Sequence, residues 1–172
     1  MKNVYEFKYG HYDHKMILRE SSFLVGVQLH GGTSVEELNR MLKGNAIEVG
    51  FCGSYRVFQI LNKNTDEIIN TIRETYPLIK TAHIYHTPDG KGEVVPTGEI
   101  YVVFKKSTST KTCMEILEKY QLTQNIRRSE HAFVAQTEDN PLALTVKLQN
   151  DSNVEIAEPD LASSPKKKVA FR

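Results

Sequence analysis

Cysteine and histidine are the side chains of this chain best suited to nucleophilic or metal chemistry. The two cysteines, Cys52 and Cys113, each lie among core-type residues, which is typical of buried free thiols. The six histidines are scattered along the chain, so neither cysteine has the histidine and asparagine context of a cysteine nucleophile. We therefore expect no catalytic cysteine and no disulfide framework.

Two pairs of histidines could ligate a metal only if the fold brought them together. His11 and His14 flank Asp13 in a polar turn, where a solvated histidine is the common arrangement. His83 and His86 are three residues apart in a predicted strand, so their side chains point to opposite faces. The sequence therefore predicts no metal site, and it indicates no cofactor.

Carboxylate pairs and nucleophile motifs give no catalytic site either. Glu36-Glu37 and Asp66-Glu67 lie at the starts of predicted helices, where negative charge complements the helix dipole. The chain has no Gly-x-Ser-x-Gly turn, no P-loop and no Gly-x-Gly-x-x-Gly segment. We therefore expect that this chain is not itself an enzyme.

The elements that would position a site follow a repeated order. Residues 1–21 predict a β-hairpin. Residues 22–97 alternate between strand and helix patterns in the order β-α-β-β-α-β and end in a linker, and the same order returns at 98–160. Residues 161–172 form a basic tail. The sequence therefore predicts an α+β protein with two tandem ferredoxin-like repeats preceded by a hairpin.

Several boundaries within this pattern are marked by local signals. The returning strand of the hairpin is predicted at 16–18, separate from the first strand of the first repeat at 23–29. A capping box at 33–37 starts the first helix. Asn140-Pro141 starts the last helix, because asparagine caps well and proline suits the first helical position. The second repeat begins with a strand at 100–104.

Composition and charge limit the possible functions. The chain has 172 residues, of which 40% are apolar and 25% charged, as in ordinary globular proteins. Residues 1–160 hold 18 basic and 21 acidic groups, a net charge of −3, whereas 161–172 hold four basic groups and no acid. An acidic body disfavours a general nucleic-acid binder. The first eight residues contain no apolar run, so we expect no signal peptide, no membrane span and a cytoplasmic location.

Two binding functions remain open on this fold, because each repeat leaves one sheet face uncovered by its own helices. RNA-recognition domains share the element order, and Tyr101 and Phe133 lie in segments similar to their two strand motifs. The second segment lacks the basic start, the glycines and one stacking aromatic. Tandem repeats of this type can also bind a small regulatory ligand, although no ligand motif is present.

Two segments carry a family resemblance. Thr97–Lys105 (TGEIYVVFK) and Val154–Asp160 (VEIAEPD) resemble the opening strand and the closing motif of a propeptide-like region. This region precedes the catalytic domain of bacterial subtilisin-like serine proteases of the fervidolysin-propeptide type. Residues 9–18 and 23–27 are similar to the hairpin and strand that begin the longer members. The resemblance covers nearly the whole chain.

The resemblance implies a folding chaperone and inhibitor of a cognate subtilisin-like protease, without nucleic-acid or membrane partners. In that family the sheet of the propeptide packs on the catalytic domain, commonly against two parallel helices, and the C-terminal tail occupies the substrate cleft. The family's catalytic aspartate, histidine and serine motifs have no match in this chain. The residues then expected at the protease interface are Tyr101, Val103, Phe133, Glu158 and Pro159, and those expected in the cleft are Val169, Ala170, Phe171 and Arg172.

The tail has two interpretations. It is either a solvated end or linker, or a strand that adds to the edge strands of the cleft through main-chain hydrogen bonds. If the protease cuts after Arg172, that residue lies on the acyl side of the scissile bond, and the primary pocket of the protease is expected to be acidic. The alternative function is a stand-alone ligand- or RNA-binding regulatory protein.

Overall fold

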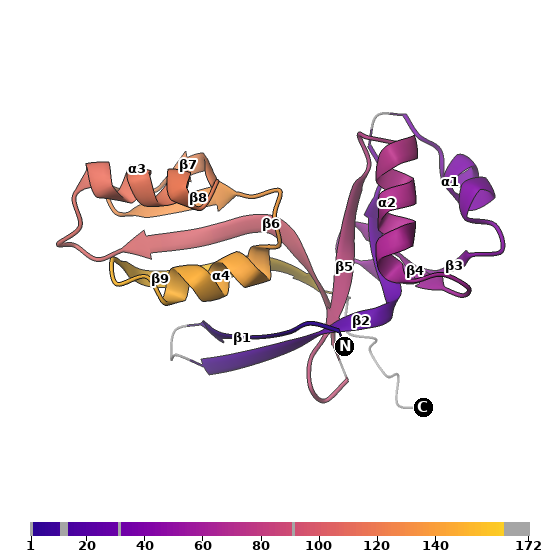
Figure 1. Cartoon of the computed structure of the whole chain (residues 1–172), viewed down its shortest axis with the longest axis horizontal. Coiled ribbons are helices and arrows are strands. Elements are labelled where there is room, and N and C mark those ends of the chain that lie inside the picture. Colours follow the sequence, from indigo (N-terminus) through magenta and orange to yellow (C-terminus); the bar gives the residue numbers. More distant parts are fainter. Residues whose placement is uncertain (1, 11–13, 31, 91, 164–172) are drawn as a thin grey trace, which may run out of the picture. The chain divides into compact units, whose positions relative to one another are not determined.

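The computed structural model describes residues 2–10, 14–30, 32–90 and 92–163 of the chain. Within this part the protein is α+β, with four helices and a large antiparallel sheet of nine strands (Figure 1). The elements follow the chain as β1 (Val4–Tyr9), β2 (His14–Gln28), α1 (Val35–Leu42), β3 (Ala46–Cys52), β4 (Tyr55–Ile60), α2 (Thr65–Thr75), β5 (Lys80–His86), β6 (Glu93–Phe104), α3 (Thr110–Lys119), β7 (Thr123–Arg127), β8 (Ala132–Gln136), α4 (Pro141–Gln149) and β9 (Val154–Ser163).

The chain forms two compact units. Of the described residues, the first unit holds 2–3, 19–95 and 162–163, and the second unit holds 4–18 and 96–161. Strands β2, β6 and β9 therefore each begin in one unit and end in the other. The predicted β-α-β-β-α-β order occurs twice, as β2-α1-β3-β4-α2-β5 and as β6-α3-β7-β8-α4-β9.

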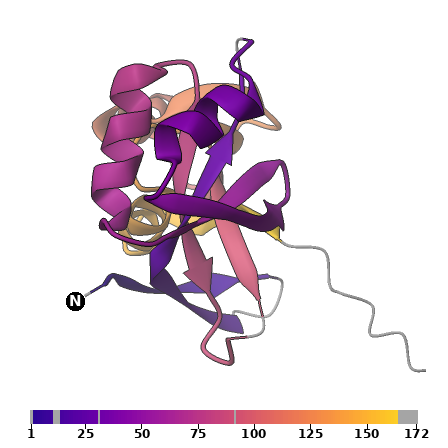
Figure 2. The ribbon, with the colours of Figure 1, turned by 90° about the vertical axis from the view of Figure 1, so that its right-hand side faces the viewer.

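In the first unit the strand order is β3-β4-β2-β5, and every neighbouring pair is antiparallel. Helices α1 and α2 lie side by side (Figure 2) and bury their apolar stripes against one face of these strands. Because successive strand residues point to opposite faces, alternate residues enter this core. The cluster consists of Val25, Val27, Leu38, Leu42, Ala46, Phe58, Ile60, Ile68, Ile69, Ile72 and Ile79.

Both helices of the first unit begin at side chains that satisfy free backbone N–H groups. The Ser34 hydroxyl accepts a hydrogen bond from the Glu37 N–H, and the Glu37 carboxylate accepts one from the Ser34 N–H. This is the predicted capping box. The Asn64 side chain accepts from the Glu67 N–H at the start of α2. The backbone N–H groups left free at a helix start are thus partly satisfied by local sequence, which makes these starts predictable.

Part of the opposite face of the first unit's sheet is also buried. Its buried strand residues are at most 4% exposed, and they are Leu24, Tyr55, Val57 and Ile84. Ile47 on β3 shares this face, because it pairs with Gln59 and Gln59 pairs with Leu24, and it is 51% exposed. Val95 from the start of β6 is fully buried against them, and Ala162 near the end of β9 packs on the same cluster. Two residues that follow β5 in sequence therefore complete the apolar packing of the buried part of this face.

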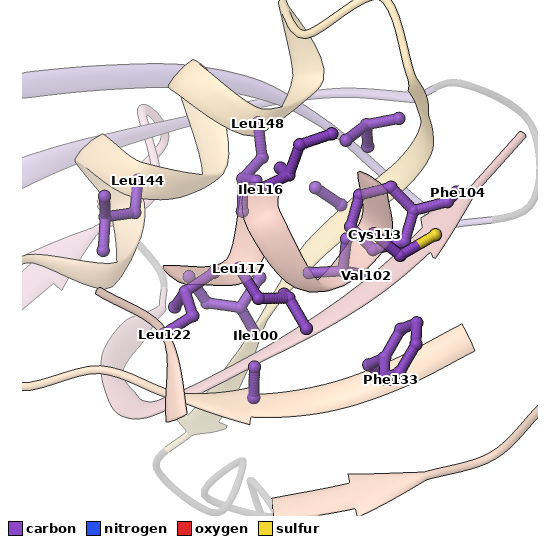
Figure 3. Packing of buried hydrophobic residues seen from close by; sticks show 13 residues of the cluster. Ile100, Val102, Phe104, Cys113, Ile116, Leu117, Leu122, Phe133, Leu144 and Leu148 are labelled. Carbon is purple, nitrogen blue, oxygen red and sulfur yellow. The ribbon is translucent and has the colours of Figure 1, made fainter. Parts of the chain in front are cut away.

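In the second unit β6 pairs with both β8 and β9, and β7 pairs with β8. Helices α3 and α4 contribute to a single core with one face of these strands (Figure 3). The Phe104 and Phe133 rings meet edge to face there, with centroids 5.8 Å apart. The other members are Ile100, Val102, Cys113, Ile116, Leu117, Leu122, Ala135, Leu144, Leu148, Val154 and Ala157.

Strand β2 differs from the prediction. The segments 16–18 and 23–29 belong to one strand, His14–Gln28, with a register shift between Glu20 and Val25. The Ser21 hydroxyl accepts hydrogen bonds from the N–H groups of Phe23 and Leu24. A bulge that satisfies these donors lets the strand change direction without a turn. Strand β6 likewise begins at Glu93, earlier than the predicted 100, and continues through Pro96 and Gly98.

Candidate functional site

The residues expected to bind a partner lie mainly on the second unit, and strand alternation separates them. On β6, Ile100 and Val102 are fully buried beneath the helices. Tyr101 and Val103 therefore point to the other face. Tyr101 is 39% exposed, and Val103 is partly exposed. These two predicted interface residues occupy a sheet face that α3 and α4 do not cover.

Phe133 lies on the opposite side from Tyr101. It is fully buried in the helix-side core, opposite Val102 in the β6–β8 ladder, and the Arg127 guanidinium lies 5.8 Å from its ring centroid. The predicted contact of Phe133 with a partner is therefore not available in this fold. Its neighbour Val134 is paired with Tyr101 and so shares the outer face.

An apolar strip crosses three strands on this outer face. Tyr101 pairs with Val134, and Val134 pairs with Ile126, which is 44% exposed. Because directly opposed residues of paired strands point to the same face, these three side chains form one row. We call Tyr101, Val103, Val134 and Ile126 the open face. A partner that contributes apolar side chains would bury this row.

A polar band lies next to the open face. The Asn125 amide donates to the Glu99 carboxylate at 3.3 Å and to the Gln136 carbonyl oxygen at 3.5 Å. Glu99 and Gln136 are themselves cross-strand partners. An apolar centre with a hydrogen-bonded polar margin is the usual composition of a protein-binding surface.

The two predicted residues of β9 are held within the second unit. Pro159 is buried, and the Glu158 carboxylate accepts a hydrogen bond from the Gly10 N–H at 2.8 Å. Burial first, and then the charges of Glu158 and Asp160, raise the pKa of the Tyr9 hydroxyl. Glu158 and Tyr101 also line one groove of about 690 Å³ in this unit. Glu158 therefore joins the hairpin to β9 at the rim of a surface that includes Tyr101.

The residues expected in the protease cleft, Val169, Ala170, Phe171 and Arg172, lie outside the described part of the chain. The last residues with a described position are Ala162 and Ser163 of β9.

A cluster of charged groups lies in the first unit, and the sequence did not indicate it. The His83 ring is placed between two carboxylates, with Nδ1 3.3 Å from Glu20 Oε1 and Nε2 3.4 Å from Asp66 Oδ1. The Glu20 side chain is only 4% exposed. Its Oε2 accepts from the Asn3 amide at 2.7 Å, and the Lys2 ammonium lies 3.2 Å from its Oε1. Four segments of the chain thus meet at one buried carboxylate.

The protonation of His83 is set by opposing effects. Burial lowers its pKa below the ordinary 6.5, the charges of Glu20 and Asp66 act in the opposite direction, and Lys2 and Arg73 lower it further. Nδ1 is shielded from solvent and, among the described residues, has no partner with hydrogen-bond geometry. Burial is the strongest of these effects, so the neutral ring is favoured.

These side chains resemble a metal site only in composition. Donor atoms of Glu20, Asp66 and His83 all lie within 4.8 Å of one another. The two ring nitrogens of His83, however, face different carboxylates, so one metal could not use both contacts. The Lys2 ammonium already lies near both acids and donates to the Thr65 hydroxyl at 2.7 Å. A lysine thus provides the positive charge that a metal would bring, and the cluster is best described as an ion-pair network.

The prediction of two buried cysteines is confirmed. Cys52 and Cys113 are both free and buried, as predicted. Burial raises the pKa of the Cys113 thiol, which opposes formation of a reactive thiolate. In the described part of the chain no helix is long and apolar enough to cross a membrane.

Comparisons with protein-family models, with curated proteins and with solved structures found no match to this chain.

Proposed function

We propose that this chain is the non-catalytic prodomain of a subtilisin-like serine protease, which it helps to fold and then inhibits. The observation that carries the proposal is the open face of the second unit. Tyr101 and Ile126 expose 39% and 44% of their surface on a sheet whose opposite face contributes to a buried core with α3 and α4. An apolar surface with a polar margin is suited to a protein partner. The family resemblance names that partner as the catalytic domain.

The strand orders support tandem ferredoxin-like repeats. In each unit the first strand of the repeat is flanked by the third and the fourth, giving β3-β4-β2-β5 and β7-β8-β6-β9. This interleaving is the strand order expected of a split βαβ fold. Prodomains of the resembled family use such a sheet to pack against two helices of the protease, and we assign this contact to the open face of the second unit.

Inhibition would come from the segment that follows β9. Val169, Ala170 and Phe171 would fill successive pockets of the cleft, with Arg172 in the primary pocket. Main-chain pairing with the edge strands of the cleft gives affinity, and the side-chain pockets give selectivity. Because the complex contains only the folded protease, binding would also stabilise the enzyme by mass action. The chain itself would supply no catalytic group, and the expected cytoplasmic location stays a prediction.

The experiment is an inhibition assay against a purified subtilisin-like protease with an acidic primary pocket. We expect tight inhibition by the full chain and at least a roughly tenfold higher Ki for a chain that ends at Ser163, the last residue of β9. Tyr101→Asp should also weaken inhibition about tenfold. Met114→Asp is the matched control, because Met114 is similarly exposed, at 43%, but lies on α3.

The alternative is an RNA-binding protein on the same fold. Burial of Phe133 removes one of the two aromatic rings that such a protein would use for base stacking. Fluorescently labelled single-stranded RNA should therefore not bind at micromolar concentration. RNA binding that Tyr101→Asp abolishes, together with no inhibition by the full chain, would replace the prodomain proposal.

A further inference from the structure

The last described residues of the chain are held by the first unit. The Gly53 N–H donates to the Ser163 carbonyl at 3.2 Å. The Cys52 thiol lies 3.5 Å from the carbonyl oxygens of both Ala162 and Glu93, and either can accept its one proton. The Ala162 side chain packs on the apolar cluster formed by Leu24, Cys52, Tyr55, Val57, Ile84 and Val95. The turn between β3 and β4 therefore contacts both the backbone and the side chain of the segment that ends β9.

Gly53 is required at this contact for two reasons. Its φ is +57°, a conformation in which a side chain is strained, and a Cβ atom at this position would lie 2.6 Å from the Ala162 Cβ. Gly90 has a similar φ of +66° but nothing within 4 Å of its Cβ position. Gly53 thus combines strain with close approach, as Gly98 does in the second unit, whereas Gly90 has the strain alone.

We propose that the turn at Cys52 and Gly53 anchors the base of the C-terminal tail, so that the first repeat fixes where the tail starts. This inference rests on the proposed function and assigns the first repeat a role in it. The second repeat provides the docking face, and the first repeat holds Ala162 and Ser163 in a set conformation. The anchor residues are positioning residues and do not touch the protease.

The anchor limits the conformational freedom of the residues from which the tail starts. Because Ala162 and Ser163 are already ordered, their backbone entropy is not lost when the complex forms. Release of the anchor makes that ordering part of the binding step, and we expect about tenfold weaker inhibition.

The test uses the full chain with Gly53→Ala and, as the matched control, Gly90→Ala. The first measurement needs no protease: the rate of iodoacetamide alkylation of Cys52, mapped by mass spectrometry. Cys52 is fully buried and lies against the Ala162 carbonyl oxygen, so release of the anchor should raise its rate at least about tenfold. Alkylation of Cys113, buried in the core of the other unit, reports unfolding of that unit. Gly90→Ala should leave Cys52 at the wild-type rate.

The second measurement is the Ki against the protease used above. Gly53→Ala should inhibit about tenfold more weakly than Gly90→Ala. Fast alkylation of Cys52 with unchanged inhibition would overturn the positioning role and leave the proposed function standing. Absence of inhibition by the wild-type chain would overturn the proposed function, while the alkylation result would still test the anchor. An unchanged Cys52 rate in Gly53→Ala would overturn the anchor itself.

A second variant covers the case in which Gly53→Ala does not fold. Ala162→Glu leaves the β3–β4 turn intact and places a charge against the apolar cluster, from which it must withdraw. It should raise the Cys52 rate and the Ki together. A folded Ala162→Glu chain with wild-type values of both quantities would contradict the proposal.

Discussion

The two units share one element order and differ in what happens on the face of the sheet away from the helices. In the first unit the part of that face formed by β2, β4 and β5 is covered: Val57 and Ile84 are at most 1% exposed, and Val95 and Ala162 pack on the same cluster. Ile47 on β3 stays 51% exposed. In the second unit Tyr101 and Ile126 on the corresponding face are 39% and 44% exposed.

The element order of a repeat therefore does not by itself determine whether its outer sheet face is buried or exposed. Both faces carry apolar side chains in strand alternation. Over β2, β4 and β5 the first is covered by two residues that follow β5 in sequence, one on β6 and one on β9. A partner could supply the corresponding cover for the second. The first face thus contributes to stability, and we assign the second to binding.

The largest expected effect is a difference in stability between two variants, each of which places one charge on the outer sheet face of one unit. Val57→Asp puts a carboxylate into a dry apolar cluster and should lower the free energy of unfolding by about 3–5 kcal/mol. Tyr101→Asp replaces a side chain that already meets solvent, so it should change stability by less than about 1 kcal/mol. Urea unfolding followed by hydrogen exchange in peptides of each unit measures both. Val57→Ala separates the cost of the charge from that of the cavity.

Similar destabilisation by Val57→Asp and Tyr101→Asp would mean that the two faces are packed alike. The comparison would then fail, and the open face would lose its role as a docking surface.

The local features of this fold could be predicted from the sequence. The capping box of Ser34 and Glu37 and the cap at Asn64 depend on residues three apart, and such spacing is visible in any sequence. The repeated element order could be predicted for the same reason, because each helix and strand has its own periodicity.

It was harder to predict which side chains of a strand face the core and which face outward. Phe133 and Val134 are adjacent, and a shift of one residue exchanges the two faces of a strand. The five residues of β8 contain apolar side chains on both faces, so alternation alone does not identify the buried one. Only the pairing of Val102 with Phe133 does so.

The ion-pair network of the first unit was beyond sequence reasoning for a different reason. Lys2, Glu20, Asp66 and His83 come from four separate segments, and no spacing links them. Asp66 was expected only to complement the dipole of its helix. The one available signal was Glu20 next to Ser21, a polar pair between two apolar strand segments. The predicted strands at 16–18 and 23–29 left that pair between them.

A smaller effect distinguishes corresponding helix starts in the two units. Ser34 caps α1 within a reciprocal capping box, in which Glu37 also accepts from the Ser34 N–H. Ser109 caps α3 by accepting from the Thr112 N–H and shares a hydrogen bond with the Thr112 hydroxyl, but no acidic residue of the first turn returns a bond to its backbone N–H. Ser34→Ala should cost about 1–2 kcal/mol and Ser109→Ala about 0.5–1 kcal/mol. Hydrogen exchange in peptides of each helix measures the local loss. Ser34→Asp keeps a capping acceptor and should retain most of the stability. A larger loss at Ser109 than at Ser34 would contradict the value assigned to the reciprocal bond.

The smallest expected effect is a pH dependence that comes from His83 in the first unit. Burial holds the pKa of folded His83 below 6.5, and Lys2 and Arg73 act in the same direction against Glu20 and Asp66. In the unfolded chain the ring titrates near 6.5, so just below that pH the unfolded state binds more protons than the folded state. The stability of the first unit should therefore fall as the pH is lowered from about 7.5 through 6.5, and the loss should be complete below the folded pKa.

Hydrogen exchange in peptides of the first unit between pH 7.5 and 5, corrected for the intrinsic exchange rate, measures this slope. His83→Asn should flatten it, because the titrating group is gone. Asp66→Asn should steepen it, because loss of the acid removes a charge that opposes burial and so lowers the pKa of His83 further. The opposite result would be a stability that rises as the pH is lowered, together with a lower stability of the His83→Asn variant. It would mean that the charges of the two carboxylates outweigh burial in setting the pKa of His83. The imidazolium would then be the buried form, and the network would bind Glu20 through His83 as well as through Lys2.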